Sequence, residues 1–491
     1  MYLFSKILYY NYIYSCLCFM EEKSLYKNRC YMPFILYPPD MYDVSQGEES
    51  IKLEKSLDLD SGGNDFVMYL SVPYCRIRCK ACPYFVELLP KNTDKQASML
   101  DRYVDALVKD LKRHASNKRW GESTLRGVYI GGGTGSLLEI NHLEKILNTL
   151  TSSFRLDSDC EITLEGNAED FTEAKARFIA NSVINRISLG AQSFQPEVLK
   201  TVGSPHKASK TIDTIRMLQK AGIEHIQLDM MYNMPGHTIE QWENDFQVLS
   251  ELGIKHLTTY LYRVTPGTRQ EKLINEGKVP PVADAESEVV KNMQMMITQF
   301  AENAGMKNYM LEHYALPGYE SKYNKWTMSE CVDALGIGAG AYSFINQRRT
   351  GTSKDIERYI RSVEYEKDTF TTAGIQLTPM ISRQRYIIFN LLYYRIDKKH
   401  YFNTWGTEVS ADFPEIIVSL ISDGLIVEDP DVLRVTELGK NWLQNIMLEF
   451  FDDSMWENSM ALKQQQSSWA MNNHMIDIGA SNKSFWLERV E

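Results

Sequence analysis

Three cysteines, Cys75, Cys79 and Cys82, stand in a C-x3-C-x2-C arrangement directly after an apolar run. Thiolates are the usual ligands of iron–sulfur clusters, and a cubane cluster normally takes four. Three thiolates on one short loop therefore hold three irons and leave the fourth iron open to a small molecule. Zinc is the main alternative, but zinc sites normally pair two C-x2-C units or add histidines, and no second pair follows nearby. The spacing favours an iron–sulfur cluster.

Length and composition restrict the class of protein. The 491 residues are enough for two or three domains. Hydrophobic residues make up 44% of the chain and charged residues 24%, which is ordinary for a globular protein. The net charge of −11 argues against a general nucleic-acid binder. No apolar run approaches the ~20 residues that span a bilayer, and eight cysteines do not form a dense disulfide framework. We therefore expect a protein without a membrane span.

Short β-rich runs alternate with amphipathic segments between residues 66 and 312. This alternation predicts a parallel sheet with right-handed crossovers. About six βα units predict an α/β fold, a partial (β/α)6 barrel of the TIM type, with its site at the carboxyl ends of the strands. The predicted strands cover residues 67–72, 127–130, 161–165, 186–189, 225–230 and 255–261, and the predicted helices cover residues 99–114, 142–150, 210–221, 239–252 and 284–304.

The remaining segments flank this core. Residues 1–65 form an N-terminal arm, whose first 20 residues fit a weak signal or anchor, or a stretch ahead of a true start at Met20. Residues 313–375 are expected to be an irregular connection that closes the site, and 376–453 a mostly helical, winged-helix-like domain. The polar residues 454–491 predict a mobile tail.

Polar or glycine-rich motifs follow the predicted strands. Three glycines, 131–133, precede Thr134 after the second strand, and glycines let a backbone approach a ligand closely. Glu165 ends the third strand, Gln192 follows the fourth, and Asp229 ends the fifth. A glycine run alone is usually a tight turn, and a lone glutamate is usually a solvated acid. A buried strand-end aspartate is more often functional, because an unpaired buried charge is costly.

Together, the cysteine loop and these motifs resemble the radical S-adenosylmethionine (SAM) superfamily. The closer resemblance is to oxygen-independent coproporphyrinogen III dehydrogenases and their relatives: haem chaperones, anaerobic haem-opening methyltransferases and class C methylases. The resemblance implies a [4Fe–4S] cluster on the three cysteines, whose open iron binds SAM and cleaves it to methionine and a 5′-deoxyadenosyl radical. It implies that Tyr69, Gly132 and Glu165 contact this SAM, with Tyr342 closing over it. A second SAM would contact Gly133, Thr134, Gln192 and Asp229. The resemblance assigns catalytic roles to Tyr69, Glu165 and Asp229.

Three positions depart from the family's best-known members. Tyr84 stands where the dehydrogenases carry a fourth cysteine, and Ser204 aligns with their second-SAM arginine. Tyr323 stands where the haem chaperones carry a histidine. Arg263, after the sixth strand, is a possible substitute for the missing arginine, because an arginine fork pairs with a carboxylate bidentately; an ordinary surface cation is the equal alternative.

Two functions follow from the resemblance. The first is a radical enzyme that oxidatively decarboxylates a tetrapyrrole or, as a class C enzyme, methylates a metabolite. The second is a haem-binding chaperone with little turnover, for which His313, His206 and His237 are candidate ligands. We expect a flavodoxin- or ferredoxin-type electron donor, a small-molecule substrate (a tetrapyrrole or secondary metabolite), no nucleic acid and a monomer. The cluster's sensitivity to oxygen predicts a cytoplasmic location.

Overall fold

The computed structural model describes residues 25–31, 65–265, 267–365, 370–372, 377–457 and 483–490. Predictions that concern residues 1–24 and 32–64 lie outside these ranges. In the described part of the chain, twelve strands form one sheet in the order β14-β13-β12-β11-β1-β4-β5-β6-β7-β8-β10-β9. No helix there is long and apolar enough to cross a membrane.

Six neighbouring parallel strands form the centre of this sheet and confirm the predicted partial barrel. Every predicted strand and helix is present, with bounds that differ by a few residues. The strands are β1 (Phe66–Val72), β4 (Thr124–Gly132), β5 (Arg155–Gly166), β6 (Arg186–Gln192), β7 (Ile226–Tyr232) and β8 (His256–Leu261).

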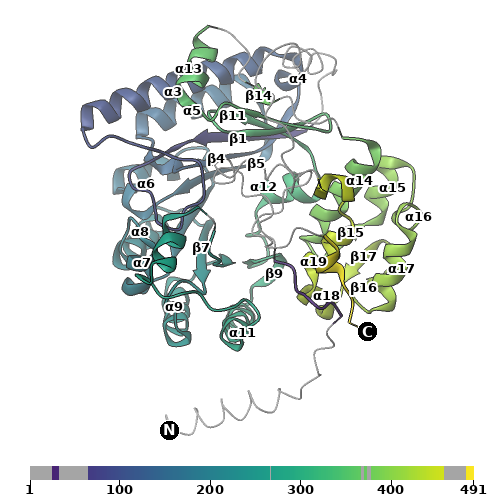
Figure 1. Cartoon of the computed structure of the whole chain (residues 1–491). Helices are drawn as coiled ribbons and strands as arrows, with labels where there is room; N and C mark the ends of the chain where they lie inside the picture. Colours follow the sequence, from purple (N-terminus) through teal and green to yellow (C-terminus); the bar gives the residue numbers. More distant parts are fainter. Residues whose placement is uncertain are drawn as a thin grey trace.

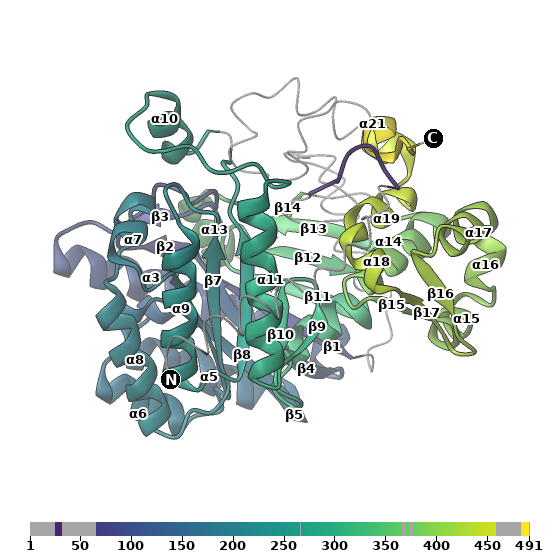
Figure 2. The ribbon, with the colours of Figure 1, turned by 90° about the horizontal axis from the view of Figure 1, so that it is seen from below.

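Helices cover the outer face of the curved sheet (Figure 1). Their caps follow the sequence: Asn92 accepts from Lys95 N at the start of the first long helix, and Thr238 and Gln241 form a capping box at another. These helices are α3 (Thr93–Ser116), α4 (Lys118–Gly121), α5 (Ile140–Ser153), α6 (Glu173–Ala180), α7 (Pro196–Val202), α8 (Ala208–Lys220), α9 (Ile239–Leu252) and α11 (Glu288–Asn303), with 3-10 turns η1 (Gly135–Leu137) and η2 (Ala168–Asp170). The short helix α10 (Arg269–Asn275), between β8 and α11 in sequence, lies apart from the sheet (Figure 2).

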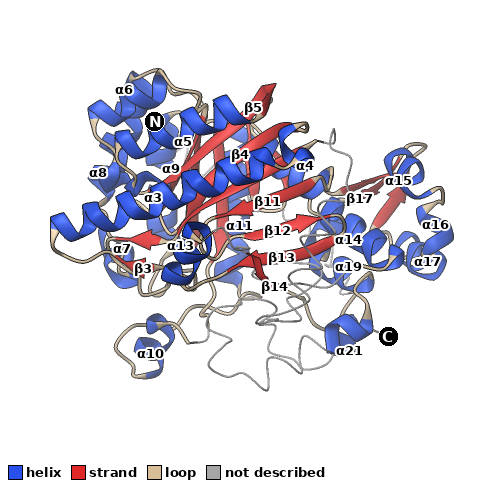
Figure 3. Cartoon of the chain, turned by 90° about the horizontal axis from the view of Figure 1, so that it is seen from above, coloured by secondary structure: helices blue, strands red, loops and turns tan. Residues whose placement is uncertain are grey.

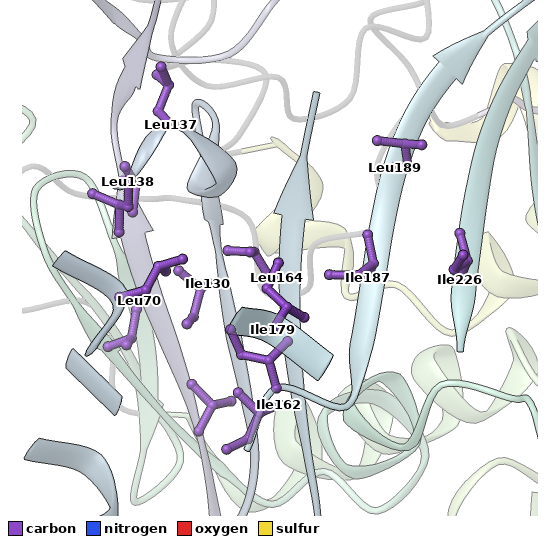
Figure 4. Close-up of a cluster of buried hydrophobic side chains, with 14 of the residues drawn as sticks. Leu70, Ile130, Leu137, Leu138, Ile162, Leu164, Ile179, Ile187, Leu189 and Ile226 are labelled. Carbon is purple, nitrogen blue, oxygen red and sulfur yellow. The ribbon is translucent and has the colours of Figure 1, made fainter. Parts of the chain in front are cut away.

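Alternate residues of the central strands form the hydrophobic core against these helices. Figure 4 shows the part of this cluster around Leu70, Ile130, Leu164, Ile187 and Ile226. Successive side chains of a strand point to opposite faces of a sheet. The residues between these apolar positions therefore face the interior of the barrel, and many of them are polar or aromatic.

Both edges of the central sheet are extended by later parts of the chain. The expectation of an irregular connection over 313–375 is wrong for these residues, because one strand pairs in parallel with β1 through Tyr69 and Gly336, and antiparallel strands continue from it. Gly338, at φ +100°, permits the tight turn between the first two. The added strands are β11 (Asp333–Ile337), β12 (Tyr342–Ile345), β13 (Arg348–Thr352) and β14 (Phe370–Thr372) on one edge, and β10 (His313–Ala315) and β9 (Lys307–Met310) on the other. Helical segments α12 (Lys322–Asn324), the π-helical turn η3 (Lys325–Ser329) and α13 (Ile356–Glu364) lie between them in sequence.

The C-terminal region has its own hydrophobic core, as the predicted winged-helix-like domain requires. A three-stranded sheet, β15-β17-β16, packs with helices (Figure 1). This core also takes in Met310 of β9 and Phe344 of β12, so the C-terminal domain contacts both extended edges of the large sheet. Its elements are α14 (Pro379–Leu391), β15 (Arg395–Asp397), α15 (Lys398–Trp405), α16 (Val409–Asp412), α17 (Pro414–Ser422), β16 (Ile426–Glu428), β17 (Val432–Val435), α18 (Glu437–Asn441) and α19 (Leu443–Glu449).

The two ends of the described chain meet on this domain. Tyr26 and Arg489 form a β-bridge, and Arg489 pairs with Glu449 at 2.9 Å and with Asp423 at 2.7 Å. The helix α21 (Lys483–Leu487) precedes this contact. The sequence predicted a mobile tail over 454–491, but residues 483–490 pack against the C-terminal domain, since their charges and aromatic side chains find partners distant in sequence.

Candidate active site at the carboxyl ends of the strands

The three predicted cluster ligands lie on one loop at the carboxyl end of β1. Cys75 ends the short strand β2 (Tyr74–Cys75), which pairs with β3 (Glu87–Leu88), and Cys82 N donates to Cys79 O at 3.2 Å. Lys80 fastens the loop to the end of α7, since its backbone N donates to Val202 O at 2.9 Å and its ammonium group donates to two further carbonyls there. All three thiols are half-buried and free of disulfides.

Burial and mutual proximity disfavour thiolates on this loop in the absence of a cation. Burial raises the pKa of Cys75 to about 11, and burial, followed by Cys82 and Cys75, raises the pKa of Cys79 to about 12. A bound cation inverts this balance, because it stabilises the thiolate form. Among the described residues, no three His, Cys, Asp or Glu side chains approach closely enough to ligate a single metal ion. In a cubane, each thiolate ligates a different iron, so the donor set fits an iron–sulfur cluster.

The glycine run packs between the cysteine loop and β5. A side chain at Gly133 would lie 2.6 Å from Tyr74 O, and one at Gly131 would collide with the Glu165 carboxylate. The following Thr134 places its hydroxyl 3.3 Å from Cys75 Sγ. Gly135, which stands where the family has proline, is buried with no room for a Cβ, since one would lie 2.5 Å from Ile130 O. These close approaches explain why glycine occupies the run.

Two carboxylates lie at neighbouring strand ends. Glu165 accepts a hydrogen bond from Gly132 N at 3.2 Å, and Asp229 accepts from Ser188 Oγ at 3.0 Å and Gln227 Nε2 at 2.9 Å. Burial, with a smaller contribution from Asp229, raises the pKa of Glu165 to about 7. Both side chains are partly exposed, whereas the residue before each on its strand is fully buried. The sheet therefore presents two acids toward the barrel interior.

Tyrosines line the interior beside these acids. Tyr69 stacks on Tyr129, with ring centroids 5.9 Å apart, and Tyr129 lies 5.4 Å from Tyr323. Burial, followed by Glu165, holds the pKa of Tyr69 well above its usual value, so its phenol stays protonated and can donate a hydrogen bond. Burial also raises the pKa of Tyr260, to which Asp229 contributes next.

A buried ion network holds Tyr323 in this position. The Glu161 carboxylate accepts from Ser321 Oγ at 3.0 Å and from the backbone N of Lys322 and Tyr323 at 3.1 and 3.0 Å. Arg186 lies 3.7 Å from Glu161. Tyr323, which stands where the haem chaperones carry a histidine, therefore packs in a defined aromatic contact with Tyr129. Burial raises the pKa of its phenol, which disfavours a phenolate ligand.

The sequence analysis missed Tyr129, Tyr260 and Ser188 as lining residues. A signal was available, because strands buried on both faces of a parallel sheet are usually continuous hydrophobic runs. Here the strands alternate, as in Ile187-Ser188-Leu189 and Leu228-Asp229-Met230. Such alternation in parallel strands indicates a polar barrel interior.

The other predicted SAM-contacting residues lie around this interior. Gln192 adopts φ +59°, an uncommon value for a non-glycine residue, and Asp245 holds the chain directly after it through Ser193 Oγ at 2.7 Å and Phe194 N at 2.8 Å. Tyr342 begins β12, with the Arg349 guanidinium 4.5 Å above its ring. Ser204 Oγ lies 3.3 Å from His206 Nδ1.

Arg263 has a contact that the sequence analysis did not anticipate. Its guanidinium donates to Tyr31 O and lies 5.2 Å from the Tyr31 ring. It also lowers the pKa of the neighbouring Glu312, which burial raises overall to about 7. Arg263 therefore joins the N-terminal segment to the loop after β8, and its role toward a second SAM stays a prediction.

The three candidate haem ligands occupy different environments. His313 Nδ1 donates to Leu311 O at 2.8 Å, which makes Nε2 the basic nitrogen, and its ring lies 6.4 Å from Tyr260 in the interior. His206 has a partner at each nitrogen, with Nε2 3.2 Å from Ala191 O. His237 is buried against Trp242, and burial lowers its pKa to about 4. Of the three, His313 has the environment best suited to a ligand inside the barrel.

Comparisons with known proteins agree with this geometry. The family model described as the Radical SAM superfamily matches residues 69–249. The chain is 26% identical to the haem chaperone HemW of Lactococcus lactis over 78% of this chain and 97% of that protein, and 25% identical to anaerobilin synthase of Escherichia coli O157:H7 over 58% and 64%. The solved structure of the coproporphyrinogen III oxidase HemN of Escherichia coli matches with a TM-score of 0.72 at 20% identity, over 86% of this chain and 96% of that one.

Proposed function

Because this chain belongs to the radical SAM superfamily, in the branch that includes HemN and HemW, we propose that it is a radical enzyme whose [4Fe–4S] cluster is held by Cys75, Cys79 and Cys82. The observation that carries the proposal is the convergence of the cysteine loop and the strand-end acid Glu165 on one glycine run. Cys75 Sγ lies 3.3 Å from the Thr134 hydroxyl, and Gly132 N donates to Glu165 at 3.2 Å.

The residues around the run have separate tasks. The cluster, when bound, supplies the electron that cleaves SAM to methionine and a 5′-deoxyadenosyl radical. Glu165 accepts hydrogen bonds from the ammonium or ribose hydroxyl groups of SAM, and its amide partner at Gly132 keeps the carboxylate aimed at the glycine run. Tyr69 donates from a phenol that burial keeps protonated, and Tyr342 closes over the ligand.

A second SAM is proposed beside the first, at Gly133, Thr134, Gln192 and Asp229. The Ser188 and Gln227 hydrogen bonds hold the Asp229 carboxylate toward the interior, where it can accept from a ribose or an ammonium group. Two SAM molecules suit two successive hydrogen abstractions from a tetrapyrrole or a methyl donor beside a radical generator. The substrate is accordingly proposed to be a tetrapyrrole or a metabolite that becomes methylated.

An anaerobic assay for 5′-deoxyadenosine, with and without coproporphyrinogen III, tests the enzyme. We expect product in both cases and a rise with the correct substrate. The Asp229→Ala variant should keep deoxyadenosine formation from the first SAM and lose substrate conversion. One bound SAM per cluster together with unchanged Asp229→Ala kinetics would reject the two-SAM arrangement.

The second candidate is a haem-handling protein of the HemW type. It is favoured by the haem chaperones, which match this chain over nearly their whole length, and by His313, whose Nε2 is the basic nitrogen inside the barrel. Haem titration followed at the Soret band tests it. We expect His313→Ala to abolish a stoichiometric complex if this function is correct, whereas His400→Ala, in the C-terminal domain, should leave it intact.

An electron donor and a compartment complete the proposal. The cluster requires a one-electron donor of the flavodoxin or ferredoxin type, and its sensitivity to oxygen favours the reducing cytoplasm. We expect the protein to act as a monomer.

A further inference from the structure

Exposed apolar and basic side chains surround the cysteine loop. Ile77, between Cys75 and Cys79, is 53% exposed, and Leu88, which pairs with Cys75 across the β2–β3 ladder, is 49% exposed. Single exposed apolar residues are normal on a protein surface. Here two large ones flank the half-buried thiols, together with the exposed cations Arg76, Arg78 and Lys91. These five residues are called the cysteine-loop face below.

The charge of this face is opposite to that of the whole chain. Residues 76–95 contain five cations and two acids, whereas the chain carries a net charge of −11. Arg76 is partly neutralised by Asp170 at 3.1 Å, and the ammonium group of Lys80 is turned onto α7. Arg78 donates to the Tyr84 carbonyl at 3.3 Å, and its positive charge also acts on the nearby Cys82 thiol, but neither Arg78 nor Lys91 forms a salt bridge within the described ranges. The face thus keeps cationic charge, at Arg78 and Lys91, that no acidic side chain of the described residues neutralises.

We propose that the cysteine-loop face docks an acidic one-electron carrier protein. This inference rests on the proposed function, since an electron must reach the cluster from outside. In the transfer the carrier loses one electron and the cluster gains it, and no bond or proton changes at this step. The electron then enters the C5′–S bond of SAM, which breaks to give methionine and the deoxyadenosyl radical.

The position of the face suits this partner. Strand β3 and helix α7, which hold the loop, lie on the side of the barrel remote from the C-terminal domain, as both Figure 2 and Figure 3 show. A carrier bound there approaches the thiols directly, while the strand ends stay available to SAM and substrate. Electron-transfer encounters use small interfaces, below about 1,200 Å² in total, so a patch of five residues is sufficient.

Binding of an oxidised, acidic flavodoxin to the full-length holoprotein tests the proposal without turnover. Charge reversal by Arg78→Glu with Lys91→Glu should weaken binding about tenfold or more at low ionic strength, because attraction becomes repulsion. The difference should shrink at high salt, since exposed charges are screened. The matched control is Lys112→Glu with Lys399→Glu, two exposed cations on α3 and α15 that give the same net charge; it should bind like the parent protein.

Reduction kinetics separate this inference from the proposed function. Bleaching of the cluster by reduced flavodoxin should slow in the Arg78/Lys91 variant, whereas bleaching by the methyl viologen radical cation, a small reductant that needs no docking face, should not. Ile77→Ser should slow the flavodoxin reaction at all salt concentrations. If flavodoxin follows this pattern but no SAM is cleaved, the docking face stands and the proposed function fails. Equal losses in the control pair, unchanged binding in the Arg78/Lys91 variant, or displacement of flavodoxin by a 20-nucleotide RNA at similar concentration would overturn the docking proposal.

Discussion

The cysteine loop and the strand ends form two halves of one site, yet they are held in different ways. The loop around Cys79 is half-exposed and is tied by a few hydrogen bonds to α7, β3 and α10. The pKa of its Cys79 thiol is raised first by burial and then by the neighbouring cysteines. At the strand ends, Glu165 and Asp229 follow the fully buried residues Leu164 and Leu228 and accept fixed hydrogen bonds. We therefore expect the loop to gain its final order from a bound cluster, whereas the strand ends are built by the sheet.

Ligand binding is expected to order the cysteine loop, whereas folding of the sheet positions the strand-end acids. Thiolates crowded on a loop repel one another until a cation neutralises them. A carboxylate on a strand between paired neighbours is positioned as soon as the sheet forms, because its backbone belongs to a cooperative unit. Substitutions on the loop should thus act through the metal, and substitutions at the strand ends should act through SAM.

The largest effect is expected at the loop. Cys79→Ala should remove the cluster's absorbance and all SAM cleavage, because a site with three thiolates has no substitute ligand. Iron and sulfide analysis of the anaerobically reconstituted protein measures this. Cys160→Ala, at a buried cysteine of β5, and Cys331→Ala are the matched controls and should retain full iron. Iron that stays in Cys79→Ala but leaves Cys331→Ala would show that the ligands are wrongly assigned.

The next effect concerns the first SAM. Glu165→Gln should leave the iron content unchanged and weaken SAM binding by roughly tenfold to a hundredfold, since a charge-assisted hydrogen bond is worth about 1.5–3 kcal/mol. Equilibrium dialysis measures the affinity, with Glu173→Gln on the exposed face of α6 as control. Unchanged affinity in Glu165→Gln would contradict this placement.

The same residue predicts a pH dependence. The pKa of Glu165 is raised to about 7 by burial, then by Asp229, so the group is ionised above that pH and protonated below it. Because the carboxylate is the stronger acceptor, SAM affinity in the parent protein should fall as the pH drops through 7. The Glu165→Gln variant should show a flat profile, and a parallel decline in both proteins would assign the titration to another group.

A smaller effect is expected where a neighbour holds an acid in place. Ser188→Ala removes one of the two side-chain hydrogen bonds to Asp229. A hydrogen bond to a charged acceptor is worth about 1.5–3 kcal/mol, but Gln227 still holds Asp229, so binding of the second SAM should weaken only about fivefold, with the first unaffected. A titration that resolves the two SAM equivalents measures this, and equal weakening of both would indicate a general structural defect instead.

The smallest effect should distinguish the two halves directly. Removal of the cluster with a chelator should speed amide exchange and tryptic cleavage at Arg76 and Arg78, because the loop loses its metal. Exchange at Leu164 and Leu228 should change by less than about twofold, since the β5–β6 and β7–β8 pairings do not involve the cluster. Loss of protection at both places would mean that the metal supports the whole sheet.

Much of the barrel and half of the site followed from local sequence. The six strands and their helices were predictable from periodicity. The predicted helix over 239–252 has the bounds of α9, whose capping box and Gly253 are local signals of its two ends. The cysteine spacing predicted the cluster-binding loop, and the glycine run predicted the segment that packs beside it. Tyr129 and Tyr260 carry a weaker signal, because the alternation of their strands indicates the face toward which they point but not that this face lines a ligand site.

The features that the sequence left open depend on partners far apart in the chain. Strand β11 pairs with β1 across more than 250 residues, Arg263 contacts Tyr31, and the last described residues pack beside Tyr26. The local sequence around these residues does not indicate such contacts. The contacts become favourable only when the sheet, the C-terminal domain and both chain ends assemble together. Periodicity and turn residues act within a few positions and set the elements, whereas packing between distant segments sets which side chains share the barrel interior.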